Sequence, residues 1–264
     1  MAEISRELTA ECAPILRIAE EELGPKLAAL YLYGSAVTGG LRYDSDLDFL
    51  AVTGSGLRPA ERKTLTDRLL RASGRWPRTG AARPVELTVV ARAALDTPGF
   101  PPRAEFVYGE WLRADLELGH LPEPVHDPDL TILIAMARQS SWALYGPPAH
   151  RLFAPVPSGD IVRAIAASLP ALLDGMAGDE RNTVLTLARM WVTAESGALV
   201  SKAEAAHSLA ARVPPEYAAT LRLARAGYLG QTADDWTDRA DEVAAFARYA
   251  ADRIGSACAG SATP

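Results

Sequence analysis

The chain reads LYLYGS at residues 30–35 and DLDFLAV at residues 46–52. Each apolar run has the length of one short buried strand. Gly34, at the end of the first run, allows a tight turn and a close approach of the backbone to a ligand. Asp46 and Asp48 open the second run two positions apart, and side chains at that spacing on a strand share a face. The stretch therefore predicts two strands joined by a turn-rich loop, with two carboxylates directed toward a Gly-Ser turn.

A third carboxylate, Glu86, lies inside another β-rich run, PVELTVV at residues 84–90. Burying a lone carboxylate among Val and Leu is costly unless a partner compensates its charge. A bound cation or a proton-transfer role would account for it. Carboxylate oxygens suit Mg²⁺, which proteins hold with one or two carboxylates together with substrate phosphates. Asp-x-Asp and Gly-Ser pairs alone are common in loops that bind nothing, so it is their order along the chain that favours a phosphate and metal site.

Composition narrows the class of protein. The chain has 264 residues, 48% hydrophobic content and a net charge of −6, which predicts a globular protein of one or two domains. The negative charge argues against a nucleic-acid partner, since such binding relies on Lys and Arg contacts to phosphates, and it suits a polycationic small molecule. No apolar run approaches the roughly 20 residues that span a bilayer, and no signal peptide is recognisable. We expect a cytoplasmic protein that has no membrane contact and works as a monomer.

The order of the segments predicts an α+β fold. The expected elements are a helix up to about residue 26, strands at 27–33, 47–53 and 84–90, and helices at 58–72 and 104–117. From about Asp129 onward the pattern is almost wholly helical, and Pro residues punctuate the chain up to Pro157. We therefore expect residues 1–157 to form a domain with a small mixed β-sheet and residues 158–264 to form an α-helical bundle.

The helical half carries polar groups of its own. A stripe with the 3.6-residue helical period contains Asp179, Asn182, Thr186, Arg189 and Thr193, with Val184, Leu187, Ala188 and Trp191 on the other side. The stripe is either a solvated face or the wall of a cleft, and the spacing does not decide between them. Ser201 and Glu204 have the spacing of a capping box. Lys202 would then lie at a helix N-terminus, where anions are favoured, or would be an ordinary exposed lysine.

Together these motifs resemble the aminoglycoside (3'')(9) adenylyltransferases, a branch of the nucleotidyltransferase superfamily. The resemblance runs from about Leu30 to Tyr249. Its segments are Gly34-Ser35, Asp46-Leu47-Asp48, Glu86, FVYGEW at 106–111, Gly146-Pro147, FAPVP at 153–157 and, most specific, AGDERN at 177–182. It implies that residues 1–157 form the nucleotidyltransferase domain and that residues 158–264 form a helical domain that completes the ATP and aminoglycoside sites.

The resemblance also implies roles for individual residues. ATP would bind as its Mg²⁺ complex, with two ions brought by the nucleotide, Asp46 and Asp48 holding the metal and Glu86 acting as general base. The implied ATP-binding residues are Ser35, Ser45, Asp46, Asp129, Arg189, Lys202 and Tyr228. From the residues alone, Asp129 could instead be a helix N-cap, and Tyr228 could be a core aromatic.

The implied acceptors are spectinomycin, at its 9-hydroxyl, and streptomycin, at its 3''-hydroxyl. The implied drug-binding residues are Glu86, Trp111, Asp174, Asp179 and Asn182. In this family the tryptophan matching Trp111 stacks against streptomycin, whereas core packing is the alternative. Members that modify streptomycin carry an acidic residue followed by tryptophan just before AGDERN, and this chain departs from them at Asp174-Gly175-Met176. The aligned residue is Gly175, so Asp174 would have to substitute for the acidic group.

Two other functions remain open from the sequence. The chain could transfer a nucleotide to a protein or to a metabolite that is not an antibiotic. It could also be a non-catalytic binding or toxin-neutralising module, although the intact set of Asp46, Asp48 and Glu86 argues against that.

Overall fold

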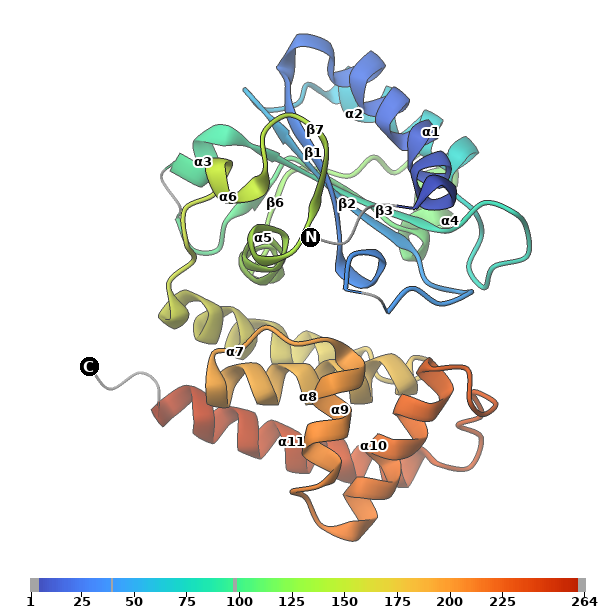
Figure 1. Cartoon of the computed structure of the whole chain (residues 1–264), viewed down its shortest axis with the longest axis vertical. Helices are drawn as coiled ribbons and strands as arrows, with labels where there is room; N and C mark the ends of the chain where they lie inside the picture. The colour runs from blue at the N-terminus through green and yellow to red at the C-terminus, as the bar shows by residue number, and fades with distance from the viewer. Residues whose placement is uncertain (1–4, 39, 97–98, 261–264) are drawn as a thin grey trace. The chain divides into compact units, whose positions relative to one another are not determined.

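A computed structural model describes residues 5–38, 40–96 and 99–260 of the chain (Figure 1). The chain divides into two compact units, Met1–Pro155 and Val156–Pro264. The first is built on a mixed β-sheet, and the described residues of the second form helices without strands. The predicted α+β fold class is therefore confirmed. No helix in the described ranges has the length and apolar character needed to cross a membrane.

The sheet of the first unit has the strand order β5-β3-β2-β1-β7. Its strands are β1 (Leu27–Tyr33), β2 (Leu47–Thr53), β3 (Val85–Ala91), β5 (Phe106–Tyr108) and β7 (Trp142–Tyr145). β2 and β3 run parallel, and the pairs β1–β2, β1–β7 and β3–β5 are antiparallel. A parallel pair requires a crossover connection, and helix α2 (Pro59–Ala72) lies between β2 and β3 in the chain.

The two faces of the sheet are covered differently. On one face Phe49 and Leu87 join a buried core with helices α1 (Arg6–Leu23) and α2. On the other face the Tyr31 ring packs edge-on against Phe153, with the ring centroids 5.5 Å apart, and its hydroxyl donates to the Pro147 carbonyl at 2.8 Å. Side chains alternate along a strand. The residues just before Phe49 and Leu87 therefore project from the face opposite α1 and α2, and these are the carboxylates Asp48 and Glu86.

The helix predicted over residues 104–117 is wrong. This stretch contains β4 (Arg103–Ala104), β5, the 3₁₀ turn η3 (Glu110–Leu112) and the short helix α4 (Arg113–Glu117). β5 pairs with Leu87–Val89 of β3, so pairing with the sheet outweighs the local helical pattern. The remaining elements of this unit are η1 (Gly24–Lys26), η2 (Gly34–Ala36), α3 (Arg92–Asp96), β6 (Val125–His126), which pairs with β4, α5 (Asp129–Gln139) and α6 (Ala149–Leu152).

Helix α8 (Glu180–Ser196) is the core of the second unit. It contacts α7 (Ser158–Asp174), α9 (Lys202–Ala210), α10 (Pro215–Tyr228) and α11 (Ala240–Gly260). The predicted apolar side is confirmed, because Val184, Leu187, Ala188 and Trp191 are all buried. The predicted polar stripe ends early: Thr193 is buried, and its hydroxyl donates to the Ala198 carbonyl at 3.0 Å. Thr193 therefore stabilises the end of the helix and adds nothing to a polar face.

Candidate active site

The turn after β1 depends on Gly34. Its φ of +69° lies in the left-handed region that favours glycine. A Cβ atom at this position would lie 2.0 Å from Oδ2 of Asp48. The backbone of the turn is therefore in close contact with the Asp48 carboxylate, and no side chain can be accommodated between them.

Three carboxylates meet beside this turn. β2 and β3 are in register so that Asp48 lies opposite Glu86, and Asp46 is the residue just before β2. One carboxylate oxygen from each of the three lies within 4.8 Å of the others, and all three residues are half-buried. Like charges this close disfavour the fully ionised state unless a cation or a proton compensates them. The cluster offers hard oxygen ligands of the kind that Mg²⁺ prefers.

Ser35 and Ser45 both precede the cluster in sequence, Ser35 next to Gly34 and Ser45 next to Asp46. Within the described part of the chain, the buried Oγ of Ser35 has no hydrogen-bond partner, and such an unsatisfied hydroxyl costs free energy. Oγ of Ser45 accepts from the Arg42 N–H at 2.9 Å, and the Ser45 N–H donates to the Arg42 carbonyl at 3.2 Å. Because a hydroxyl can accept and donate at once, Ser45 can hold this turn and still donate to a phosphate oxygen.

In the second unit, Asp179, Asn182 and Lys202 form one hydrogen-bonded chain. Nδ2 of Asn182 donates to Oδ2 of Asp179 at 2.8 Å, and Nζ of Lys202 donates to Oδ1 of Asn182. The predicted capping box is confirmed: Ser201 Oγ accepts from the Glu204 N–H at 3.2 Å, and Glu204 Oε2 accepts from the Ser201 N–H at 3.0 Å. Lys202 is thus the first residue of α9, where the helix dipole adds to its positive charge.

The other predicted ATP-binding residues lie at helix ends and on α8. Asp129 is the exposed first residue of α5, and its N–H donates to Oδ1 of Asp127 at 2.9 Å. Asp129 therefore lies inside the helix with Pro128 as the N-cap, and the alternative interpretation of Asp129 as the N-cap is wrong. Burial raises the pKa of Asp127 above its usual value. Tyr228 is the half-buried last residue of α10, and Arg189 is half-buried on α8.

Among the predicted drug-binding residues, Trp111 is the one aromatic group, and it lies in the 3₁₀ turn η3. Its side chain is 61% exposed, which excludes the core-packing alternative. The indole lies over Gly109, where a Cβ atom would be 2.2 Å from the ring. Asp174 is the exposed last residue of α7, and Gly175 follows it as the C-cap.

Known proteins match this chain along nearly all of its length. Residues 151–253 match the family model for the aminoglycoside adenylyltransferase C-terminal domain. A spectinomycin 9-adenylyltransferase of Staphylococcus aureus is 42% identical over 246 residues, which cover 93% of this chain and 95% of that protein. The chain belongs to the aminoglycoside adenylyltransferase family. Its members are nucleotidyltransferases, so the resemblance found in the motifs is confirmed.

Two further relatives of this adenylyltransferase support the assignment. An aminoglycoside (3'')(9) adenylyltransferase of Escherichia coli is 37% identical over 245 residues, covering 92% of this chain and 93% of that one. The crystal structure of a spectinomycin adenyltransferase from Enterococcus faecialis, determined with ATP and spectinomycin, superimposes with a TM-score of 0.89. It is 31% identical and covers 94% of this chain and 99% of its own.

A buried ion pair, which the sequence analysis missed, anchors the turn that carries Trp111 in the adenylyltransferase. Nε of Arg113 lies 2.6 Å from Oε2 of Glu110, and each side chain is 8% exposed. Glu110 also accepts from the hydroxyls of Ser73, at 2.7 Å, and Tyr108, at 2.9 Å. Burial alone would raise the pKa of Glu110, but the hydrogen bonds from Arg113, Ser73 and Tyr108 outweigh it and hold that pKa below its usual value.

Replacing Arg113 with Gln is expected to lower the free energy of unfolding by about 3 to 5 kcal/mol, because it leaves the Glu110 carboxylate buried without its cation. Urea denaturation measures the loss. Arg239→Gln is the matched control, since Arg239 forms an i,i+3 pair with Glu242 at 3.0 Å with both side chains exposed, and such pairs contribute less than about 1 kcal/mol. Equal losses for the two variants would contradict a special role for the buried pair.

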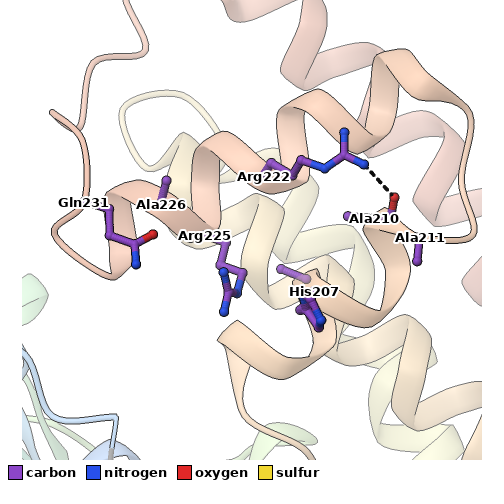
Figure 2. Close-up of a pocket in the computed structure, with 8 residues that line it drawn as sticks. His207, Ala210, Ala211, Arg222, Arg225, Ala226 and Gln231 are labelled. Carbon is purple, nitrogen blue, oxygen red and sulfur yellow. Dashed lines mark hydrogen bonds between the residues drawn. The ribbon is translucent and has the colours of Figure 1, made fainter.

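The second unit of the adenylyltransferase also contains a cavity of about 340 Å³ between α9 and α10 (Figure 2). Its polar lining comes from His207, Arg222, Arg225 and Gln231, over small alanines. Nε of Arg225 donates to the Ala203 carbonyl at 3.2 Å. None of the predicted site residues belongs to the described lining, so this cavity is separate from the residues that the sequence singles out.

Proposed function

We propose that this adenylyltransferase transfers AMP from ATP to the 9-hydroxyl of spectinomycin and to the 3''-hydroxyl of streptomycin, releasing pyrophosphate. The observation that carries the proposal is the cluster of Asp46, Asp48 and Glu86 against the Gly34 turn. It occurs in a chain that is 42% identical, over 93% of its length, to a spectinomycin 9-adenylyltransferase. The relative determined with ATP and spectinomycin supports the same pair of substrates.

Asp46 and Asp48 would hold two Mg²⁺ ions that arrive with ATP. The fit rests on the donor set, since the cluster supplies carboxylate oxygens within 4.8 Å of one another, and on the glycine that leaves room for the Asp48 carboxylate. When bound, these ions neutralise the triphosphate and stabilise the charge that develops on the attacking and leaving oxygens.

Residues of both units would bind the nucleotide. A phosphate oxygen would accept from the Ser35 hydroxyl and satisfy its buried oxygen, and Ser45 would donate to another. Lys202 and Arg189 would bind the phosphates through charge-assisted hydrogen bonds, and the helix N-terminus at Lys202 favours an anion. Asp129 and Tyr228 would contact the rest of the nucleotide. In this proposal residues 1–157 act as the nucleotidyltransferase domain, and residues 158–264 complete both sites.

Glu86 would act as the general base. It accepts the proton of the drug hydroxyl while the hydroxyl oxygen forms a bond to the α-phosphorus. The bond from the α-phosphorus to the bridging oxygen breaks, and pyrophosphate leaves with that electron pair. The position of Glu86 opposite Asp48 supports this role, because it brings the base to the same strand ends as the metal ligands.

The drug would be held through its positive charges and its rings. Asp179 and Asp174 would bind ammonium or guanidinium groups, and Asn182 would orient Asp179, with which it already shares a hydrogen bond of 2.8 Å. The exposed indole of Trp111 supports streptomycin as the second acceptor, since it offers a flat surface for stacking. Gly175 supplies no acidic group, so the charge in this region comes from Asp174.

Pyrophosphate release from Mg–ATP, measured with spectinomycin, with streptomycin and without acceptor, tests the proposal. We expect release with either drug and a product whose mass has increased by one adenylyl group. Release with spectinomycin alone would remove streptomycin and point to Gly175 as the cause. Release with neither drug would overturn the choice of acceptor and favour a protein or another metabolite.

Replacing Trp111 with Ala is expected to lower kcat/KM for streptomycin by about tenfold, the loss of one cation–aromatic contact. The same constant for spectinomycin should change little. Trp76→Ala is the matched control, because Trp76 is 57% exposed and belongs to none of the predicted sites. Equal effects on both drugs would contradict a role for Trp111 in telling them apart.

A further inference from the structure

We infer that Arg83 is a positioning residue for the nucleotide and metal site, because its guanidinium holds the loop that delivers Ser45 and Asp46. The inference deepens the proposed function and rests on it. Arg83 lies in the segment just before β3. It belongs to none of the motifs by which the chain resembles its family.

The Arg83 guanidinium binds three backbone carbonyls of one loop. Its Nη1 lies 2.6 Å from the carbonyl oxygen of Arg42, 3.0 Å from that of Tyr43 and 3.1 Å from that of Ser45. Its Nε donates to Oε2 of Glu11 in α1 at 2.9 Å, and the Arg83 side chain is 12% exposed. One side chain thus joins the loop to a helix that packs in the core of the unit.

The contact with Ser45 bears directly on the metal site. The Ser45 carbonyl belongs to the planar peptide unit whose nitrogen is that of Asp46, so a bond to this oxygen restricts the orientation of the backbone that carries the Asp46 carboxylate. On the other side, the Leu47 N–H donates to the carbonyl of Pro84 at 2.9 Å. Pro84 directly follows Arg83. The same short segment therefore fixes the backbone on both sides of Asp46.

The chemistry of the contact suits arginine. A guanidinium carries its N–H donors on separate nitrogens in a rigid plane, so Nε binds Glu11 while the two hydrogens of Nη1 are shared among the three loop carbonyls. Lysine has a single nitrogen on a flexible chain, so it cannot bind Glu11 and the loop carbonyls from two donor positions held a fixed distance apart. Hydrogen bonds from a charged donor are also stronger than neutral ones. Holding the loop before ATP arrives lowers the ordering cost that binding would otherwise carry.

Two neighbouring residues separate this role from general stabilisation of the loop. Arg78 donates to the Tyr43 carbonyl at 3.2 Å and lies over the Tyr43 ring, 4.9 Å from its centroid. It supports the tip of the loop without contacting Ser45. Glu11 binds Arg83 from the α1 side, so its loss removes the ion pair and keeps the carbonyl contacts. Arg78→Gln and Glu11→Gln are therefore matched controls for Arg83→Gln.

The test is the equilibrium binding of Mg–ATP to the purified full chain, measured by calorimetry without any acceptor. Arg83→Gln is expected to weaken Mg–ATP binding by about tenfold or more, the equivalent of one charge-assisted hydrogen bond. The two control variants should weaken it by less than about threefold. At saturating Mg–ATP, KM for spectinomycin should stay within about twofold of the wild-type value, because a loop effect on the nucleotide does not alter the drug contacts.

Several outcomes would overturn the inference. Wild-type affinity for Mg–ATP in folded Arg83→Gln would do so, as would equal losses in Arg83→Gln and Arg78→Gln. If Arg83→Gln does not fold, Arg83→Lys decides: it should bind Mg–ATP at least about threefold more weakly, and unchanged binding would refute the role. Because no acceptor is present, Mg–ATP binding that depends on Arg83 supports the inference even if both drugs prove inert, which would refute the proposed acceptors alone.

Discussion

Glu86→Gln is expected to lower kcat by about 10²- to 10⁴-fold while leaving the affinity for Mg–ATP within a few fold of wild type. The amide has nearly the shape of the carboxylate but cannot accept the proton of the drug hydroxyl at neutral pH. The position of Glu86 opposite Asp48, near the starts of two parallel strands, brings a carboxylate oxygen within 4.8 Å of those of the predicted metal ligands. Steady-state pyrophosphate release and calorimetric binding of Mg–ATP measure the two quantities separately.

Glu105→Gln is the control for this variant. Glu105 is a buried carboxylate of the same unit, 5% exposed, and accepts from the Leu57 N–H at 3.3 Å. An amide oxygen can accept the same bond, so turnover should remain near wild type. Near-wild-type turnover of Glu86→Gln with intact Mg–ATP binding would refute the base assignment. Loss of Mg–ATP binding in Glu86→Gln would instead indicate that Glu86 acts mainly as a metal ligand.

Gly34→Ala is expected to abolish Mg–ATP binding and to lower kcat/KM at least a hundredfold. The added methyl group would lie 2.0 Å from Oδ2 of Asp48, so either the carboxylate or the turn has to move. A misplacement of about 1 Å is enough for a hundredfold loss in rate. The positive φ adds a conformational cost of about 1 to 2 kcal/mol to the folded state.

Gly197→Ala separates the two effects. Gly197 ends α8 with a φ of +72°, close to that of Gly34, and a Cβ atom there would meet nothing within 4 Å. This variant should lose stability to a similar extent in thermal denaturation but keep its affinity for Mg–ATP. Normal Mg–ATP binding by Gly34→Ala would contradict this prediction, because it would show that nucleotide binding does not require the observed position of the Asp48 carboxylate.

The sequence predicts the strands of the first unit well where they are continuous apolar runs. β1 and β2 have the predicted bounds, and β3 is displaced by one residue. The sequence analysis did not predict β5 and β7 and assigned helical structure there instead. Both are short strands at the edges of the sheet. Their conformation comes from hydrogen bonds to β3 and β1, and such long-range pairing leaves no local signal.

The candidate site divides in the same way. Asp46 and Asp48 are only two positions apart, so their placement on one face of a strand could be predicted from the sequence. The alignment of Glu86 with Asp48 depends on the register of two parallel strands joined by a long crossover. Arg83 was missed because its partners on the loop are backbone carbonyls, which every residue type carries, and because Glu11 is 72 positions away in the sequence. The exposure of Trp111 also required the structure, since a buried and an exposed tryptophan have the same sequence pattern there.

The chain from Asp179 through Asn182 to Lys202 has a thermodynamic consequence. The side-chain amide of Asn182 accepts a hydrogen bond from Lys202 with its oxygen and donates one to Asp179 with its nitrogen. A ligand that pulls Lys202 or Asp179 toward itself therefore also changes the hydrogen bond that Asn182 makes with the other residue. If Asp179 holds the antibiotic and Lys202 the nucleotide, the two ligands do not bind independently. Whatever factor ATP imposes on the affinity for the drug, the drug must impose on the affinity for ATP, and Asn182 is the residue through which that cooperativity would pass.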